Sequence, residues 1–187
     1  MSPRPRVVVA GIGNEYRSDD GVGPVVAHAV AARAGAPGNP DPGTTAEVLA
    51  GIADPLDLLG RWDDAALAVI VDATRSGPPG TVTLVELSGP EAASEPPSLP
   101  RQNDPSPPTP GHTGGPSSTH GFGVVRAVRL ARALGHGPAR VVLVTVAGAA
   151  FGRGTGLSTE VAQAVPDAVA LVLATVAAAQ RLRSAGR

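Results

Sequence analysis

One stretch near the amino terminus, residues 6–33, constrains the possible fold more than any other. "RVVVAG" is a short, continuously apolar run ended by glycine, which is typical of a buried strand. The glycine-rich loop "GIGNEYRSDDGVG" follows it. From Asp19 or Asp20 to Arg33, apolar residues then recur at spacings of three and four, which predicts a helix. A strand, a tight loop and a helix in this order predict the first unit of an α/β sheet.

The rest of the chain continues this alternation. Further strands are predicted at "AEVLA", "ALAVIVDA" (ending at Asp72), "GTVTLVEL" and "ARVVLVTVAG". A helix capped by Asp54 begins at Pro55, an amphipathic helix follows Thr119, and a short helical turn, "GLSTEVAQA", precedes a last helix that we expect to open at Pro166. The order β-α-β-α-β-β-α-β-α predicts a mostly parallel sheet with helices on both faces and ligands at the carboxyl ends of the strands.

The length of 187 residues suits a single domain over 1–187. Residues 88–118 contain nine prolines and almost no apolar side chain, so they cannot bury a core. We expect this segment to be a long mobile loop and not a domain boundary, because neither flank makes a complete sheet alone.

Composition excludes several kinds of chemistry. The chain has no cysteine and no lysine, which excludes disulfides, thiolate metal sites, P-loop lysines and Schiff bases. A net charge of −1 gives no sign of the excess positive charge that nucleic-acid-binding proteins carry. No signal peptide is expected, and no run approaches the length of a membrane span. We therefore expect a cytoplasmic protein without membrane or nucleic-acid partners.

The glycine-rich loop does not match a dinucleotide site well. Three residues after Gly13 stands Tyr16, where the fingerprint needs a third glycine. Asp19 and Asp20 at the helix start would repel a pyrophosphate. Capping would explain one of these acids but not both. A dinucleotide-binding α/β protein is thus a disfavoured alternative.

Three residues at strand ends or helix starts form the candidate site: Asp20, Asp72 and His120. Taken singly, each has an ordinary explanation as a cap, a turn residue or a structural histidine. In a doubly wound sheet, however, these positions converge at one edge. Two carboxylates and an imidazole can bind a divalent transition metal or perform general acid–base catalysis.

With these residues in place, the sequence resembles the hydrogenase maturation endopeptidases, which remove the C-terminal extension of the nickel-containing large subunit of nickel–iron hydrogenases. The resemblance lies in four motifs that follow one another along nearly the whole chain: "VVVAGIGNEYRSDDGVGPVVAHAV", "DPLDLLGRWDDAALAVIVDA", "SSTHG" and "FGRGTGLSTEVAQAVPDAV". It implies a three-layer α/β/α fold with about five strands, one of them antiparallel.

The same resemblance implies the chemistry. Asp20, Asp72 and His120 would contact Ni²⁺ already inserted in the large-subunit precursor, so that only metal-loaded precursor is cut. The residues themselves fit this picture. Gly11 and Gly13 would let a substrate backbone approach closely, and Asp19 or another carboxylate could act as general base.

The chain also departs from the family pattern. Asp20 stands where relatives often have Glu, Ala147-Gly148 replaces a Glu-Gly step, and the insertion at 88–118 is unusually long. These departures leave room for a second function, that of a non-catalytic paralogue that binds a metal-bearing partner without cutting it.

Overall fold

A computed structural model describes residues 6–34, 46–87 and 119–185, without the side chains of 34, 119–122 and 182–185. It contains a five-stranded sheet in the order β2-β1-β3-β5-β4. All neighbouring strands are parallel except β4, which runs antiparallel to β5. The strands are β1 (Val7–Ile12), β2 (Glu47–Ile52), β3 (Leu67–Thr74), β4 (Val82–Glu86) and β5 (Val141–Ala147).

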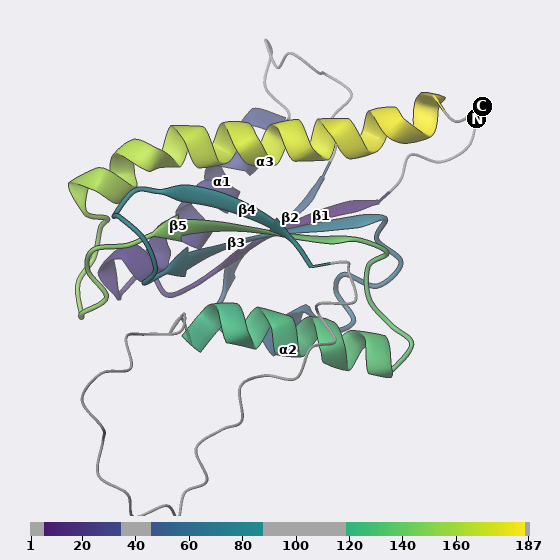
Figure 1. Cartoon of the computed structure of the whole chain (residues 1–187), viewed down its shortest axis with the longest axis horizontal. Coiled ribbons are helices and arrows are strands. Elements are labelled where there is room, and N and C mark those ends of the chain that lie inside the picture. The colour runs from purple at the N-terminus through teal and green to yellow at the C-terminus, as the bar shows by residue number, and fades with distance from the viewer. Residues whose placement is uncertain (1–5, 35–45, 88–118, 186–187) are drawn as a thin grey trace, which may run out of the picture.

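Helices cover both faces of this sheet, so the predicted three-layer architecture is confirmed (Figure 1). On one face lie α1 (Val22–Ala34), which continues from the short 3-10 helix η1 (Ser18–Gly21), and α3 (Thr159–Ala185). On the other lie α2 (Thr119–Ala133) and the 3-10 helix η2 (Pro55–Leu58). The proline-rich segment 88–118, predicted to be a mobile loop, lies outside the described residues.

The central strand β3 is apolar from Leu67 to Val71 because each of its faces packs against helices. Val69 and Val71 belong to the cluster under α1 and α3, whereas Ala68 and Ile70 belong to the cluster under α2. By this alternation Asp72 lies on the α2 face of the sheet. The strand does not end at Asp72 as predicted but continues to Thr74, because β5 pairs with it up to that residue.

The C-terminal helix corrects a second prediction. Instead of a short turn followed by a helix that opens at Pro166, α3 is one helix with Pro166 inside it. Proline removes one backbone hydrogen bond there. The buried stripe continues across it, however, with Val161 and Ala164 on one side and Ala168 and Val172 on the other. Packing of both halves on the sheet outweighs the local breaking tendency of the proline.

The helix expected at "PLDLLGRW" is reduced to η2. The predicted cap at its start is present, since Asp54 Oδ1 accepts a hydrogen bond of 2.9 Å from the N–H of Leu56. Gly60, at a φ of 77°, follows shortly afterwards and is in a conformation that does not continue a helix.

One helix, contrary to the sequence-based expectation, is long and apolar enough to cross a membrane. The segment Thr159–Arg181 of α3 has a mean hydropathy of 1.8. Of its most apolar window 39% is buried within the fold, and this buried side packs on the sheet. A core helix passes the same test, so this feature is weak support for a membrane span.

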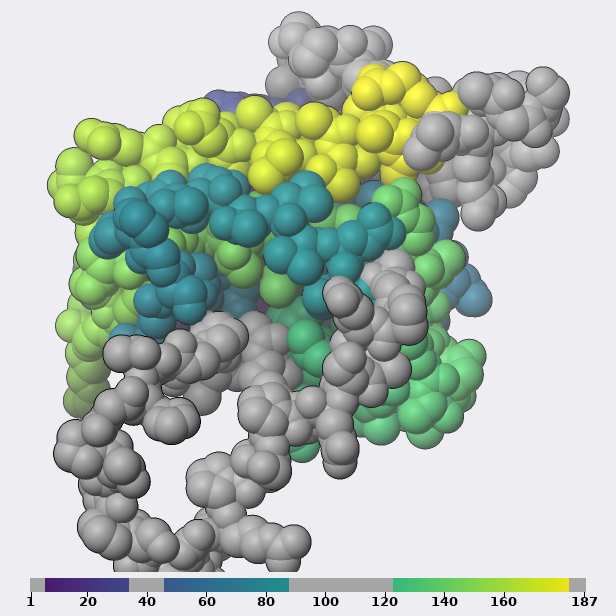
Figure 2. All heavy atoms as spheres, viewed as in Figure 1, coloured from purple at the N-terminus to yellow at the C-terminus, as the bar shows by residue number. Residues whose placement is uncertain are grey.

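Strand β4 forms one edge of the sheet. Figure 2 shows its residues at the surface, in teal, between α3 and the green α2. Leu84 and Val85 are accordingly exposed. The candidate residues lie elsewhere, at the ends of the parallel strands β1 and β3.

Candidate functional site

The parallel strands β1, β3 and β5 end at a common edge of the sheet, here called the carboxyl edge. Two loops are joined there. The N–H of Ser18 donates to the carbonyl oxygen of Gly154 at 2.9 Å, and the N–H of Gly154 donates to that of Tyr16 at 3.0 Å. The loop after β1 and the loop after β5 therefore form one connected rim above the sheet.

Asp19 holds this rim together. Its side chain is completely buried and accepts hydrogen bonds from the N–H groups of Ala149 and Ala150, each at 2.8 Å. It also accepts one from the N–H of Ser158 at 2.6 Å and one from the Ser158 hydroxyl at 3.0 Å. Both carboxylate oxygens are thus engaged by the loop after β5.

The pKa of Asp19 follows from these contacts. Burial would raise it, but the donors on Ser158, Ala150 and Ala149 stabilise the charged form and bring the pKa below its usual value. A carboxylate with a lowered pKa and both oxygens occupied is poorly suited to take a proton from water. These contacts make Asp19 an anchor for the loop after β5, and the general-base role predicted for it stays a prediction that they do not favour.

Asp20, the next residue, lies beside the end of β1. It is 4% exposed, and its Oδ2 accepts a hydrogen bond of 3.1 Å from the N–H of Asn14. Neither aspartate occupies the cap position of η1, which belongs to Arg17. The ordinary capping explanation therefore does not account for the pair.

Asp72 is completely buried within β3, and its Oδ1 accepts a hydrogen bond of 2.8 Å from the N–H of Ala73. A carboxylate is rarely buried completely, because it must leave water. A buried ionisable group near the carboxyl edge of the central strand is typical of a functional residue. Asp72 is therefore the strongest single candidate among the described side chains.

His120 lies in the first turn of α2. Because α2 leads into the start of β5, its own first turn lies at the carboxyl edge, on the α2 face that Asp72 also occupies (Figure 1). The His120 side chain is outside the described part of the structure. Within the described side chains, no three of His, Asp and Glu gather as metal ligands would. The meeting of Asp20, Asp72 and His120 thus stays a prediction.

The glycines of the first loop serve packing, contrary to the role predicted for them. A Cβ on Gly11 would lie 2.3 Å from the carbonyl oxygen of Gly23, and one on Gly13 would lie 1.8 Å from that of Asp20. The space beside both glycines is filled by η1 and α1. It is not available to a substrate backbone or to a phosphate, which further disfavours the dinucleotide alternative.

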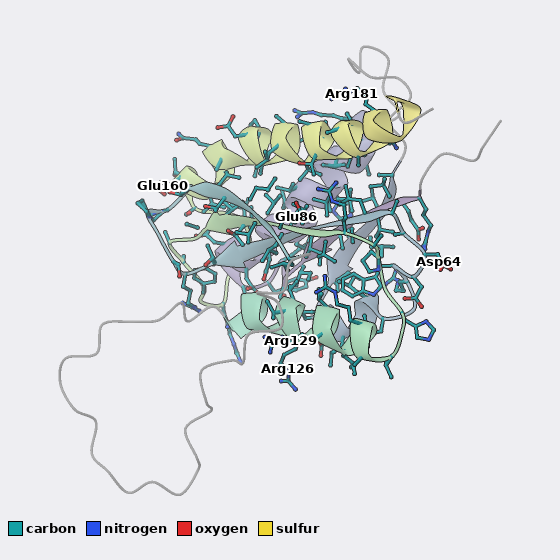
Figure 3. The ribbon with its side chains drawn as sticks, turned by 45° about the vertical axis from the view of Figure 1, so that its right-hand side comes forward. Asp64, Glu86, Arg126, Arg129, Glu160 and Arg181 are labelled. Carbon is teal, nitrogen blue, oxygen red and sulfur yellow. The ribbon has the colours of Figure 1, made fainter. Side chains whose placement is uncertain are left out.

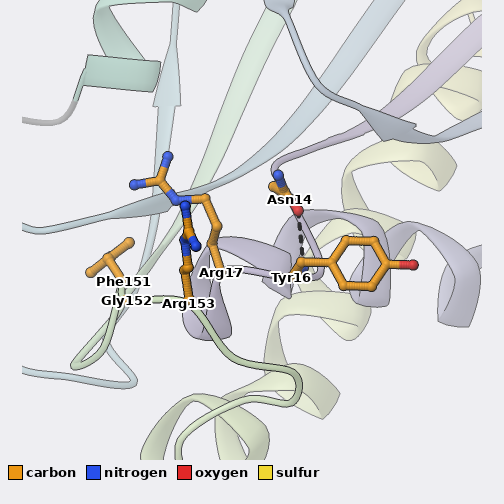
Figure 4. Close-up of a pocket in the computed structure, with 6 residues that line it drawn as sticks. All are labelled: Asn14, Tyr16, Arg17, Phe151, Gly152 and Arg153. Carbon is orange, nitrogen blue, oxygen red and sulfur yellow. Dashed lines mark hydrogen bonds between the residues drawn. The ribbon is translucent and has the colours of Figure 1, made fainter.

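A feature that sequence reasoning missed lies beside Asp20. A cavity of about 720 Å³ opens at the rim and is lined by residues of the two joined loops (Figure 4). Its lining residues are Asn14, Tyr16, Arg17, Phe151, Gly152 and Arg153. Exposed arginines in loops carry no local signal of a shared site, because only the pairing of the two loops brings them together.

Known structures share this architecture, whereas no family model and no curated protein matches the sequence. The hydrogenase maturating endopeptidase HybD from E. coli superposes with a TM-score of 0.67 at 23% identity, covering 97% of this chain and 94% of its own. The nickel–iron hydrogenase maturation protease HybD from Thermococcus kodakarensis gives 0.65 at 21% identity, with 91% and 99% covered.

A third similar structure is the hydrogenase 2 maturation peptidase from a Thaumarchaeota archaeon, with a TM-score of 0.54 and 24% identity over 92% of this chain and 98% of that one. Each match spans nearly all of both chains, so the agreement concerns the whole architecture and not one βα unit. The resemblance inferred from the four motifs is confirmed at the level of the fold: this chain is built on the fold of the hydrogenase maturation endopeptidases.

Proposed function

We propose that this protein is a cytoplasmic endopeptidase that removes the C-terminal extension of a nickel–iron hydrogenase large-subunit precursor after nickel has been inserted. The observation that carries the proposal is the completely buried carboxylate of Asp72 near the carboxyl edge, in the fold shared with named maturation proteases. That edge is where open α/β sheets bind their ligands.

The donor set suits the metal of such a precursor. Carboxylate oxygens and an imidazole nitrogen are ligands that Ni²⁺ accepts, and this chain offers no competing thiolate. In the proposed complex Asp20, Asp72 and His120 contact the nickel that the precursor carries, so the metal acts as the recognition element of the substrate. Precursor without nickel lacks this anchor and is bound poorly.

Hydrolysis then needs a water molecule held beside the scissile peptide. The water oxygen bonds to the carbonyl carbon, the C–N bond breaks, and the released amine receives a proton. Since the oxygens of Asp19 are occupied by Ser158 and the loop after β5, the proton-accepting group is one of Asp20, Asp72 and His120. Asp19 contributes by fixing the rim on which Asp20 lies.

The decisive experiment compares two forms of the precursor from the same genome, one loaded with nickel and one without. Intact-mass spectrometry follows the loss of the C-terminal extension. We expect trimming of the loaded form only. Equal trimming of both forms would overturn the recognition of nickel. Stable binding of the loaded form without any trimming would instead establish the non-catalytic paralogue.

Substitutions test whether the trimming depends on the candidate residues. Asp20→Asn, Asp72→Asn and His120→Ala are each expected to lower the trimming rate strongly. Matched changes at exposed positions, Asp167→Asn on α3 and His28→Ala on α1, are expected to leave it unchanged. Variants at the candidate site that trim at the normal rate would refute the assignment of these residues.

A further inference from the structure

The cavity beside Asp20 is framed by positive charge. Arg17 and Arg153, from the two joined loops, both line it and both are exposed. Figure 4 shows their side chains pointing in the same direction, away from the ring of Tyr16. No carboxylate among the described residues forms an ion pair with either guanidinium.

A third arginine contacts one of the lining residues. The guanidinium carbon of Arg75, in the loop after β3, lies 4.0 Å from the centroid of the Phe151 ring, and Phe151 lines the cavity. Such stacking holds a guanidinium in place without neutralising its charge. The loop after β3 thus adds a positive charge beside Phe151, while Arg17 and Arg153 line the cavity itself.

The cavity adjoins the acidic part of the site. Asn14 is a lining residue, and its N–H donates to the carboxylate of Asp20 at 3.1 Å. Positive charge therefore lines the opening, and the buried carboxylate of Asp20 lies next to it, within hydrogen-bond distance of the lining residue Asn14. A ligand that complements both regions carries a cation in one part and an anion in the part next to it.

From this juxtaposition we infer that the cavity is a subsite for a peptide carboxylate. This inference rests on the proposed function and deepens it: the peptide that follows the metal-bearing part of the precursor places a carboxylate against Arg17 and Arg153. The carboxylate belongs either to an acidic side chain or to the C-terminus of the peptide. Guanidinium groups match its planar, two-oxygen geometry through paired N–H donors.

Calorimetric titration with three short peptides tests the inference. The first is an acetylated, amidated Ala-Ala-Glu-Ala-Ala, the second has Gln in place of Glu, and the third is the Gln peptide with a free C-terminal carboxylate. We expect at least one of the two charged peptides to bind about tenfold more tightly than the neutral one, as charge-assisted hydrogen bonds in a partly desolvated cavity provide. Which of them does so identifies the source of the carboxylate.

Matched variants locate the effect. The double variant Arg17→Gln/Arg153→Gln and each of its single variants should reduce or abolish the preference for the charged peptide. The control Arg33→Gln/Arg126→Gln removes the same charge from exposed positions outside the cavity and should retain the preference; Figure 3 shows Arg126 on the outer side of α2. The fluorescence of Trp62, the one tryptophan of the chain, reports that each variant is folded.

Two results would overturn the subsite: equal binding of all three peptides, or a preference that survives the loss of both Arg17 and Arg153. Because the readout is binding and not cleavage, this failure is distinct from that of the proposed function. A protein that trims nickel-loaded precursor but binds the three peptides equally refutes the subsite alone. A protein that retains the arginine-dependent preference but never trims the precursor refutes the proteolytic function alone.

Discussion

The carboxylate of Asp19 accepts hydrogen bonds from both the N–H and the hydroxyl of Ser158, a residue 139 positions further along the chain. This contact fastens the loop after β5 to the loop after β1, and Ser158 directly precedes α3. The buried carboxylate of Asp19 therefore fixes the two loops that form the rim of the candidate site.

The first prediction concerns the stability that this contact provides. In Asp19→Asn the amide can accept from some of the four donors, but its NH₂ group faces the others. Since hydrogen bonds to a charged group contribute about 1.5–3 kcal/mol each, we expect the free energy of unfolding to fall by about 3 kcal/mol. Urea unfolding followed by Trp62 fluorescence measures it.

The control for this change is Asp167→Asn, because Asp167 is an exposed aspartate on α3. Its free energy of unfolding should stay within about 0.5 kcal/mol of the wild-type value. An equally small loss for Asp19→Asn would show that the hydrogen bonds of Asp19 are replaceable by water and that the rim is held in another way.

The second prediction is the dependence of this stabilisation on pH. The pKa of Asp19 in the folded protein lies below its usual value of 3.8, so the folded state favours the charged form. The resulting stabilisation is complete above pH 3.8 and is lost as the pH falls through the lower pKa of the folded state. In this acid range the wild-type free energy of unfolding should decrease more steeply than that of Asp19→Asn. Parallel slopes for the two proteins would contradict the lowered pKa.

Much of the architecture could be predicted from the sequence, for a physical reason. The strands β1, β3 and β5 are buried on both faces, so their sequences are short, mostly apolar runs rich in valine, which favour a strand over a helix. The limits of helices and strands were harder to predict from the sequence where they depend on tertiary packing. Pro166 is a local signal to begin a helix, but the buried stripe of α3 passes through it.

In the candidate site, too, features of the local sequence could be predicted, whereas contacts between distant segments could not. Asp20 and Asp72 stand out in the sequence because one is an acid at a predicted helix start and the other follows an apolar run. That Asp19, and not Asp20, binds the loop after β5 depends on donors at Ala149, Ala150 and Ser158, which no local pattern connects to it. The cavity framed by Arg17 and Arg153 likewise exists only once the two loops are paired.

The third prediction tests the packing role of the first glycine. In Gly11→Ala the new Cβ would lie 2.3 Å from the carbonyl oxygen of Gly23 and 2.8 Å from the Cβ of Ala27. Because α1 must move away from β1, we expect a loss of about 2–3 kcal/mol in the free energy of unfolding, as overpacked cores show. Gly152→Ala is the matched control, since a Cβ there meets nothing within 4 Å. Equal stability of the two variants would indicate that α1 adjusts freely and that Gly11 has another role.

The fourth prediction separates function from structure at the two completely buried aspartates. Asp72→Asn removes a buried charge with almost no change of shape, and an amide oxygen can still accept from the N–H of Ala73. We expect its free energy of unfolding to stay within about 1 kcal/mol of the wild-type value or to rise, as is common when a functional charge is removed. Its rate of trimming nickel-loaded precursor should nevertheless fall by about 100-fold or more, the loss typical for a removed acid–base group.

Asp19→Asn should show the opposite combination. It loses stability, but the fraction that remains folded, measured by Trp62 fluorescence under the conditions of the assay, should still trim the precursor, since both carboxylate oxygens of Asp19 are engaged by the loop after β5. If instead Asp72→Asn unfolded easily while its folded fraction cut at the normal rate, Asp72 would be a structural residue and the catalytic role would have to pass to Asp20 or His120.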